Sequence, residues 1–284
     1  MIPRSTDGKT RVLSLSYGKD SMACLGACEL LGWPLDRIVT ADVWATDEIE
    51  ADLPPMVEFK AEADRIIFER YGIKVEHYYA IKDGTKNTFE RMFYSRRVRG
   101  KRIGSLIGWP MVKGCEAQKQ LKIGAINLAK AAAKGNVQYI GIAFDEPQRF
   151  HNLNGTTKLS PLVAAEWTEA MCRKWAEDNG LLSPLYKFSN RGGCFYCPCQ
   201  STGQLRLLRK MYPDLWSLML KWDADLIADQ DTENPRLKRY SPHGQTLHEY
   251  EARFRLEDDN LLSEHEKNFR WTMLHDELNY RIDL

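Results

Sequence analysis

Several features that mark other protein classes are absent from this sequence of 284 residues. Its apolar runs are far shorter than the ~20 residues that a membrane-spanning helix needs. Residues 1–7 carry no apolar segment of the kind found in secretory signals. No internal repeat and no low-complexity linker is present. These absences predict a folded cytoplasmic protein that has no membrane partner.

A strong net charge is also missing, because 40 basic and 39 acidic residues leave a net charge of only +1. This balance excludes a global field that would draw the protein onto nucleic acid. Locally, however, one segment is strongly basic, and it lies between Tyr94 and Trp109. Basic side chains among aromatic rings suit phosphates and bases, whereas a solvated loop or a lid over a nucleotide is the alternative. The candidate substrate-binding residues are Arg96, Arg97, Arg99, Lys101 and Arg102.

Seven cysteines without a secretory signal favour a reducing compartment over a disulfide framework. Three of them form a dense group, in which thiolates at short spacing suit Zn²⁺ or an iron–sulfur cluster. These are Cys194, Cys197 and Cys199, and no cysteine follows them. We assign Cys24, Cys28 and Cys172 to the hydrophobic core, where small buried cysteines are common.

Hydrophobic patterning predicts strands that alternate with helices over the first two thirds of the chain. Strands are expected at 11–16, 37–44, 74–80 and 138–143, and helices at 21–32, 54–71 and 118–134. This alternation is typical of a parallel sheet with helices on both faces. Later segments are helical, with a start at Thr168, an end at Gly180 and further helices at 203–212 and 213–228. We therefore expect an α/β domain over 1–190 and a cysteine turn with a mostly helical region over 191–284.

The most informative segment is Ser16-Tyr17-Gly18-Lys19-Asp20-Ser21, which lies between the first expected strand and the first helix. A helix N-terminus offers free N–H groups and the positive end of its dipole, which together bind phosphate oxygens. Gly18 permits a tight turn, Lys19 adds a positive charge, and the two serines add hydroxyl donors. Asp20 would repel a phosphate unless Mg²⁺ lay between them, so it indicates a metal. Lys19, Asp20 and Ser21 are the candidate catalytic residues.

A second lysine-bearing segment, Gly8-Lys9-Thr10, resembles the end of a Walker A loop. The glycine that such a loop requires further upstream is replaced by Pro3, and no strand precedes the segment. We therefore reject it as a phosphate site.

The Ser16–Ser21 loop resembles the pyrophosphatase loop of the PP-loop ATPases, and more narrowly of their PAPS reductase-like branch. Three further segments resemble that branch in the same order. They are Gly141-Ile142-Ala143-Phe144-Asp145-Glu146-Pro147-Gln148-Arg149, the Ser160-Pro161-Leu162 … Glu166-Trp167-Thr168 … Ser183-Pro184-Leu185-Tyr186 series, and Arg191-Gly192-Gly193-Cys194-Phe195-Tyr196-Cys197-Pro198. One departure is Ala143, because the family usually has arginine there.

The resemblance implies an adenine nucleotide alpha hydrolase-like (Rossmann-like) fold that binds ATP and Mg²⁺. It also implies cleavage between the α- and β-phosphates, with transfer of the adenylyl group and release of pyrophosphate. Ser16, Tyr17, Gly18, Lys19 and Ser21 would contact the phosphates. The nucleotide or substrate would lie beside Gly141, Asp145, Glu146 and Arg149.

Similar family members hold a [4Fe–4S] cluster with a Cys-Cys pair and a Cys-x-x-Cys pair. By resemblance, the ligands here would be Cys115, Cys194, Cys197 and Cys199, although Gly114 replaces one member of the upstream pair. Either Cys199 completes the four thiolates, or three cysteines leave one iron open. Zn²⁺ and purely structural thiols are the alternatives.

A sulfonucleotide reductase needs a nucleophilic cysteine near its C-terminus, and this chain has none after Cys199. That absence favours family members that activate a substrate for sulfur incorporation. The expected acceptor is nucleic acid, with DNA phosphorothioation ahead of tRNA thiolation, and a cysteine desulfurase is the expected sulfur-donating partner. Two alternatives are a divergent sulfonucleotide reductase or other small-molecule enzyme, and a non-catalytic nucleotide-sensing subunit.

Overall fold

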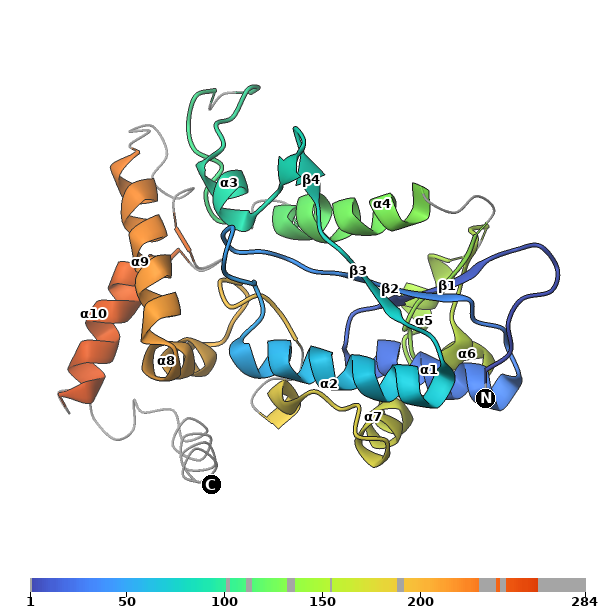
Figure 1. Ribbon diagram of the computed structural model, residues 1–284. Helices are drawn as coiled ribbons and strands as arrows, with labels where there is room; N and C mark the ends of the chain where they lie inside the picture. Colours follow the sequence, from blue (N-terminus) through green and yellow to red (C-terminus); the bar gives the residue numbers. More distant parts are fainter. Residues whose placement is uncertain are drawn as a thin grey trace. The chain divides into compact units, whose positions relative to one another are not determined.

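The computed structural model describes residues 2–100, 103–110, 114–131, 136–153, 155–187, 192–229, 239–240 and 244–259 (Figure 1). The chain forms two compact units. Unit 1 comprises Met1–Thr88 with Gln118–Gly192, and unit 2 comprises Phe89–Ala117 with Gly193–Leu284. The sequence-based boundary at residue 190 assigns segment 89–117 to the first domain, whereas here this segment groups with the C-terminal residues.

Unit 1 is built on a five-stranded parallel sheet with the strand order β3-β2-β1-β6-β7. The chain moves outward from β1 to β2 and β3 on one side, and later adds β6 and β7 on the other. The order therefore changes direction between β1 and β6, where ligands of open α/β sheets bind. The strands are β1 (Arg11–Leu15), β2 (Arg37–Ala41), β3 (Val75–Tyr78), β6 (Val137–Tyr139) and β7 (Lys158–Leu159).

Helices cover both faces of this sheet, as the alternating pattern predicted. Successive strand residues point to opposite faces, so Leu13 packs on the side of α1 while its neighbour Val12 packs against Ala129 of α4. Figure 1 shows α1 and α2 below the strands and α4 above them. The bounds are α1 (Lys19–Leu31) and α2 (Pro54–Tyr71) on one face, and the π-helical η1 (Gln118–Ile123) with α4 (Gly124–Ala131) on the other.

Helix α1 is buried from Ser21 to Cys28 because a second helical layer covers it. Helices α6 (Pro161–Ala164) and α7 (Glu169–Asp178) pack on its outer side. The packing of α7 is close: a Cβ atom on Gly26 would lie 2.4 Å from the Trp175 ring. Thr168 caps α7 through its hydroxyl, as predicted, and Gly180 follows the helix with φ +69°. Cys24, Cys28 and Cys172 are fully buried here, which confirms them as core residues.

The remaining elements of unit 1 are short. They are the β4–β5 hairpin (Ile81–Lys82 and Thr85–Lys86), α5 (Pro147–His151) and η2 (Pro184–Lys187). The expected helix at 118–134 is present as η1 and α4, but its last residues lie outside the described ranges. Within the part of the chain that the structure describes, no helix is long and apolar enough to cross a membrane.

Unit 2 is mostly helical, as predicted for the C-terminal part. Its helices are α3 (Phe89–Tyr94), α8 (Thr202–Met211), α9 (Pro213–Ala228) and α10 (Leu247–Asp258). Buried aromatic rings form its core, with Phe89 stacked on Tyr196 at 3.8 Å between centroids. The fully buried Asp223 of α9 accepts hydrogen bonds from Trp109 and from the first residues of α10, so its charge is compensated.

Candidate functional site

The Ser16–Ser21 loop lies where the strand order of the sheet changes direction, at the carboxyl end of β1. Gly18 is the N-cap of α1 and provides no side-chain cap for the helix N-terminus. Tyr17 adopts a left-handed conformation with φ +55°, which is strained for an aromatic residue. The strand, tight turn and helix of the predicted phosphate loop are therefore present.

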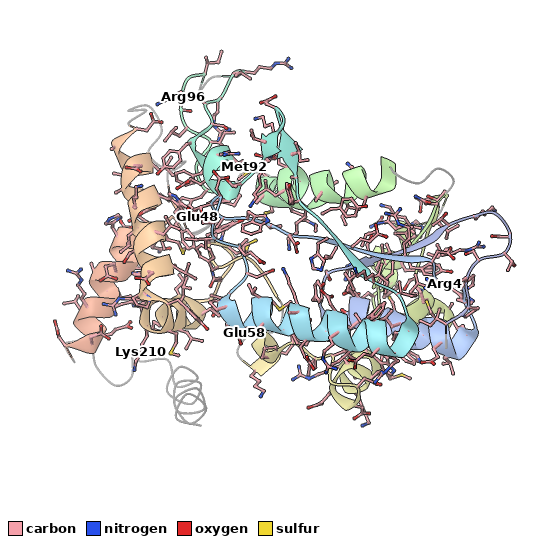
Figure 2. All side chains as sticks on the ribbon, in the orientation of Figure 1. Arg4, Glu48, Glu58, Met92, Arg96 and Lys210 are labelled. Atoms are coloured by element: carbon pink, nitrogen blue, oxygen red, sulfur yellow. The ribbon has the colours of Figure 1, made fainter. Side chains whose placement is uncertain are left out.

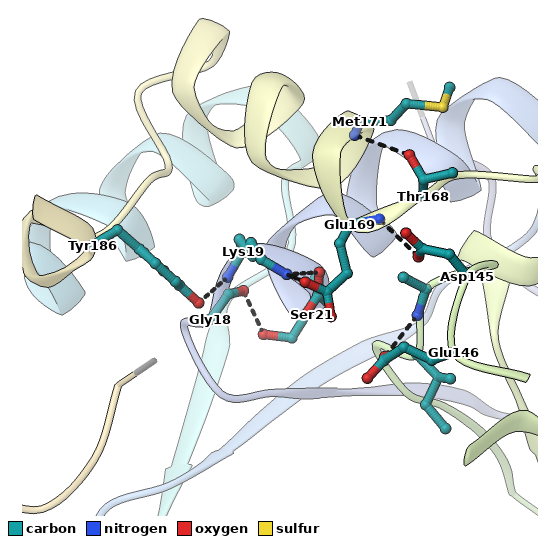
Figure 3. A network of polar contacts seen from close by, with 12 residues as sticks. Gly18, Lys19, Ser21, Asp145, Glu146, Thr168, Glu169, Met171 and Tyr186 are labelled. Atoms are coloured by element: carbon teal, nitrogen blue, oxygen red, sulfur yellow. Dashed lines mark hydrogen bonds and ion pairs between the residues drawn. The ribbon is translucent and has the colours of Figure 1, made fainter. Parts of the chain in front are cut away.

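The two serines of this loop hydrogen-bond to each other. The Ser16 N–H donates to Ser21 Oγ at 3.1 Å, and the two hydroxyl oxygens are 3.0 Å apart. The Ser21 hydroxyl in turn donates to the Gly18 carbonyl at 3.0 Å (Figure 3). Ser21 is buried and holds the turn closed, whereas Ser16 is exposed.

Lys19 is the cation of the loop, and only 12% of its side chain is exposed. Its Nζ atom lies 2.8 Å from Asp20 Oδ1 and 3.1 Å from Glu169 Oε2 of α7. Burial acts to lower the pKa of Lys19, but the two carboxylates outweigh it and raise the pKa above its ordinary value. Burial raises the pKa of Asp20, despite the adjacent lysine. One lysine thus faces two acidic side chains, so a counter-cation such as Mg²⁺ would strengthen the binding of a polyanion here.

Gly141 brings the far side of the site into direct contact with the loop. A Cβ atom at this position would lie 2.6 Å from the Ser21 amide nitrogen and 2.7 Å from the Asp20 carbonyl carbon. Because both neighbours are backbone atoms, no side chain can be accommodated without a shift of α1 or of the segment after β6. Glycine at this position is a requirement of packing.

The acidic pair after β6 has hydrogen-bonded structural partners. Asp145 Oδ1 accepts the Glu169 N–H at 2.9 Å, at the start of α7, and Glu146 Oε2 accepts the Ala143 N–H at 3.2 Å (Figure 3). Arg149 forms an ion pair with Glu146 at 2.5 Å and is otherwise exposed. Ala143, the position at which the sequence departs from the motif that it resembles, is fully buried in the core of unit 1. The predicted nucleotide contacts of Asp145, Glu146 and Arg149 remain predictions.

A polar network beside the loop was not predicted. The Tyr17 hydroxyl donates to Asp64 of α2 at 2.7 Å, and the His77 ring on β3 lies 2.9 Å from both Asp64 and Asp42. Hydrogen bonds to Asp42 and Asp64 raise the pKa of His77 to about 10. Lys60 of α2 lies 2.6 Å from Asp52 and 3.6 Å from Asp42, so it joins the same network. In the sequence, only the acidic composition of residues 42–58, after β2, pointed to charged side chains here.

Tyr186 also contacts the loop, although it lies far from the loop in the sequence. The Tyr186 hydroxyl, on η2, accepts the Lys19 N–H at 3.0 Å (Figure 3). The sequence placed Tyr186 in a family-like motif without assigning it a role. Spacing alone could not reveal the contact, because 167 positions separate the two residues.

The predicted cluster ligands belong to unit 2. The Cys197 N–H donates to the Cys194 carbonyl at 3.0 Å, and the Tyr240 hydroxyl donates to the Cys197 carbonyl at 2.6 Å, so the turn is ordered by backbone hydrogen bonds. Cys199 is exposed. Among the described residues, no three His, Cys, Asp or Glu side chains are placed to hold a metal ion. Cys115, Cys194, Cys197 and Cys199 remain predicted ligands.

The basic segment of unit 2 follows α3, and Figure 2 labels Arg96 in it. Arg96 pairs with Leu106 as an antiparallel bridge and lies 3.0 Å from Asp229, while Arg97 donates to the Ile107 carbonyl at 3.0 Å. Arg99 is exposed and makes no hydrogen bond or ion pair with any residue that the structure describes. Lys101 and Arg102 lie outside the described residues.

No family model and no curated protein matches this chain. Among solved structures, the chain is similar to the U34-tRNA thiolase NcsA from Methanococcus maripaludis with its [4Fe-4S] cluster. The two are 14% identical, with a TM-score of 0.37, and the alignment covers 89% of this chain and 82% of the thiolase. A similarity of this size establishes neither the family nor the function of the chain.

Proposed function

We propose that this protein is an ATP pyrophosphatase that adenylates a nucleic acid for sulfur incorporation. The acceptor oxygen attacks the α-phosphorus of ATP, the bond between that phosphorus and the α–β bridging oxygen breaks, and pyrophosphate leaves with the electron pair. DNA is the acceptor that we place first and tRNA the second. A cysteine desulfurase would supply the sulfur.

One observation carries this proposal: the Lys19-bearing turn meets α1 where the strand order of the parallel sheet changes direction. Backbone N–H groups at a helix start and a lysine are the groups that hold polyphosphates. The packing of Gly141 on Ser21 fixes this helix start relative to the segment after β6. Catalysis would come mainly from positioning and from charge stabilisation by Lys19, the loop amides and Mg²⁺.

The basic segment that follows α3 supports nucleic acid as the acceptor of the adenylyl group. Arg96 and Arg97 are bound to residues of their own unit, whereas Arg99 is exposed and makes no hydrogen bond or ion pair with the described residues. Arginines presented in this way contact phosphate groups without reading sequence. We derive no step from an iron–sulfur cluster, because its cysteine ligands remain predictions.

The test uses the full-length protein, Mg²⁺ and ATP, with and without DNA or tRNA, and measures pyrophosphate and orthophosphate separately. We expect pyrophosphate, and we expect Lys19→Ala to reduce its release by about 100-fold or more, because a charge-stabilising donor is removed. Lys9→Ala is the matched control, since this exposed lysine precedes β1 and should be dispensable.

Equal pyrophosphate release by Lys19→Ala and wild type would reject the assigned loop. Release of orthophosphate alone would reject cleavage between the α- and β-phosphates. Binding of ATP with neither product, in the presence of each nucleic acid, would favour a nucleotide-sensing subunit instead.

A further inference from the structure

The first amide of α1 is already hydrogen-bonded. The first N–H groups of a helix have no partner within the helix, which is why they bind anions. Here the Lys19 N–H donates to the Tyr186 hydroxyl oxygen at 3.0 Å. The same oxygen lies 3.4 Å from the point where a Cβ atom on Gly18 would stand, so the hydroxyl rests directly against the loop.

The side chain of Lys19 is occupied in a similar way. Glu169 Oε2, at the start of α7, lies 3.1 Å from its Nζ atom (Figure 3). The main-chain N–H and the side-chain ammonium of one residue, both expected to bind phosphate, are therefore in contact with two oxygens from η2 and α7.

These two oxygens differ in chemistry. Tyr186 carries a proton, and none of the described residues accepts a hydrogen bond from it. Burial raises the pKa of Tyr186, so the hydroxyl stays protonated near neutral pH. Arg173 lies over the Tyr186 ring at 5.8 Å from its centroid, which adds positive charge nearby. The Glu169 carboxylate, with 49% of its side chain exposed, has no proton to donate and repels an approaching anion.

We propose that Tyr186 is a phosphate-binding residue and that Glu169 competes with phosphate for Lys19, an inference that rests on the proposed nucleotide site. When an anion reaches the loop, the Lys19 N–H turns from Tyr186 to the anion, and the Tyr186 hydroxyl donates its free proton to the same anion. Glu169 must leave the lysine, because its carboxylate would otherwise face the anion directly.

The two roles predict effects of opposite sign. Inorganic pyrophosphate is titrated into the full-length protein in a calorimeter, with a chelator present so that no divalent cation bridges Glu169 to the ligand. Tyr186→Phe should weaken binding by about 10-fold or more, because a hydrogen bond to a charged group is lost. Glu169→Gln should strengthen binding by about 5-fold, because one negative charge near the site is removed.

Matched controls are Tyr79→Phe and Glu177→Gln, which alter an exposed tyrosine and an exposed glutamate of α7. Both should bind pyrophosphate as wild type does. Each test variant keeps the shape of the side chain, and thermal unfolding of all four variants would verify that the fold is retained. If Tyr186→Phe does not fold, Glu169→Gln still tests the competition at Lys19.

The titration distinguishes a wrong role of Tyr186 or Glu169 from a wrong nucleotide site. If wild type binds pyrophosphate, Lys19→Ala does not, and Tyr186→Phe binds as tightly as wild type or more tightly, the phosphate loop stands and the role of Tyr186 is rejected. An unchanged affinity of Glu169→Gln would reject the competition. Absence of pyrophosphate binding by wild type, both with the chelator and with Mg²⁺ in its place, would overturn the nucleotide site and this inference together.

Discussion

The phosphate loop of unit 1 and the cysteine turn of unit 2 are both short segments with glycines and chemically active side chains, yet the fold has arranged them to different degrees. In the loop, Ser16, Lys19 and Ser21 each have defined partners within about a turn of α1 or on α7 and η2. In the turn, hydrogen bonds to backbone carbonyls order the chain, but no group of three or more metal-ligating side chains is found among the described residues.

The difference has a physical reason. A phosphate site consists largely of backbone N–H groups at a helix start, so it forms when the helix and sheet form. A thiolate cluster consists of side chains whose mutual repulsion is offset only by the metal, so ligand arrangement and metal binding are coupled. The Ser16–Ser21 loop is therefore preorganised by packing, whereas a metal site in the cysteine turn would depend on its metal.

Among tests of this contrast between loop and turn, the largest effect should come from Gly141→Ala. Its Cβ atom would meet backbone atoms of Asp20 and Ser21 at 2.6–2.8 Å, so α1 or the segment after β6 must move. We expect a loss of about 1–3 kcal/mol in the free energy of unfolding and a fall of about 100-fold in pyrophosphate release. Urea unfolding and the pyrophosphate assay measure the two effects.

The control for this variant lies in the other region. Gly193→Ala, next to Cys194, meets no atom within 4 Å and has no left-handed φ, so stability and pyrophosphate release should be unchanged. If the two alanine variants behaved alike, the contrast in packing between loop and turn would be wrong.

A second test concerns the metal. The resemblance in sequence predicts that protein purified without oxygen holds iron and sulfide, and that Cys194→Ser with Cys197→Ser removes most of both. Pyrophosphate binding should be unchanged, because Lys19 and its partners all belong to unit 1. Cys172→Ser is a matched control, since this thiol is buried in the core and should not affect metal content. Colourless wild-type protein loaded with zinc would remove the cluster and leave the ATP site untouched.

The smallest expected effect is a pH dependence that arises beside the loop. Asp42 and Asp64 raise the pKa of His77 to about 10, from about 6.5 in an unfolded chain. The stability that this pairing adds is therefore complete below about pH 6.5 and is lost as the pH rises toward 10. For a partly exposed side chain we expect about 1 kcal/mol after solvent screening is taken into account.

Urea unfolding of wild type and His77→Gln between pH 6.5 and 10 would measure this contribution. The difference in free energy of unfolding between the two proteins should shrink as the pH rises. A constant difference would show that His77 stays neutral despite Asp42 and Asp64, and that Lys60 alone compensates the carboxylates of the network.

Local features of the fold were predictable where short-range physics decides them. The Ser16–Ser21 turn, the Thr168 cap and the start of α9 at Pro213 follow from residues within a few positions of each other. Helix α10 lies in the region predicted to be mostly helical, but it was not located individually, although it begins with a capping box of Thr246 and Glu249. This was a readable signal, but the surrounding sequence is too polar to show a clear apolar period.

The sequence by itself determined that the first strand leads through a lysine-bearing turn into a helix, because strand, turn and cap depend on neighbouring residues. Only the tertiary structure decided which distant groups meet that turn: the Tyr186 hydroxyl, the Glu169 carboxylate, the backbone at Gly141 and the Asp64 carboxylate beneath Tyr17. Such contacts depend on the order of strands in the sheet and on how the covering helices pack. Neither is encoded at short range in the chain.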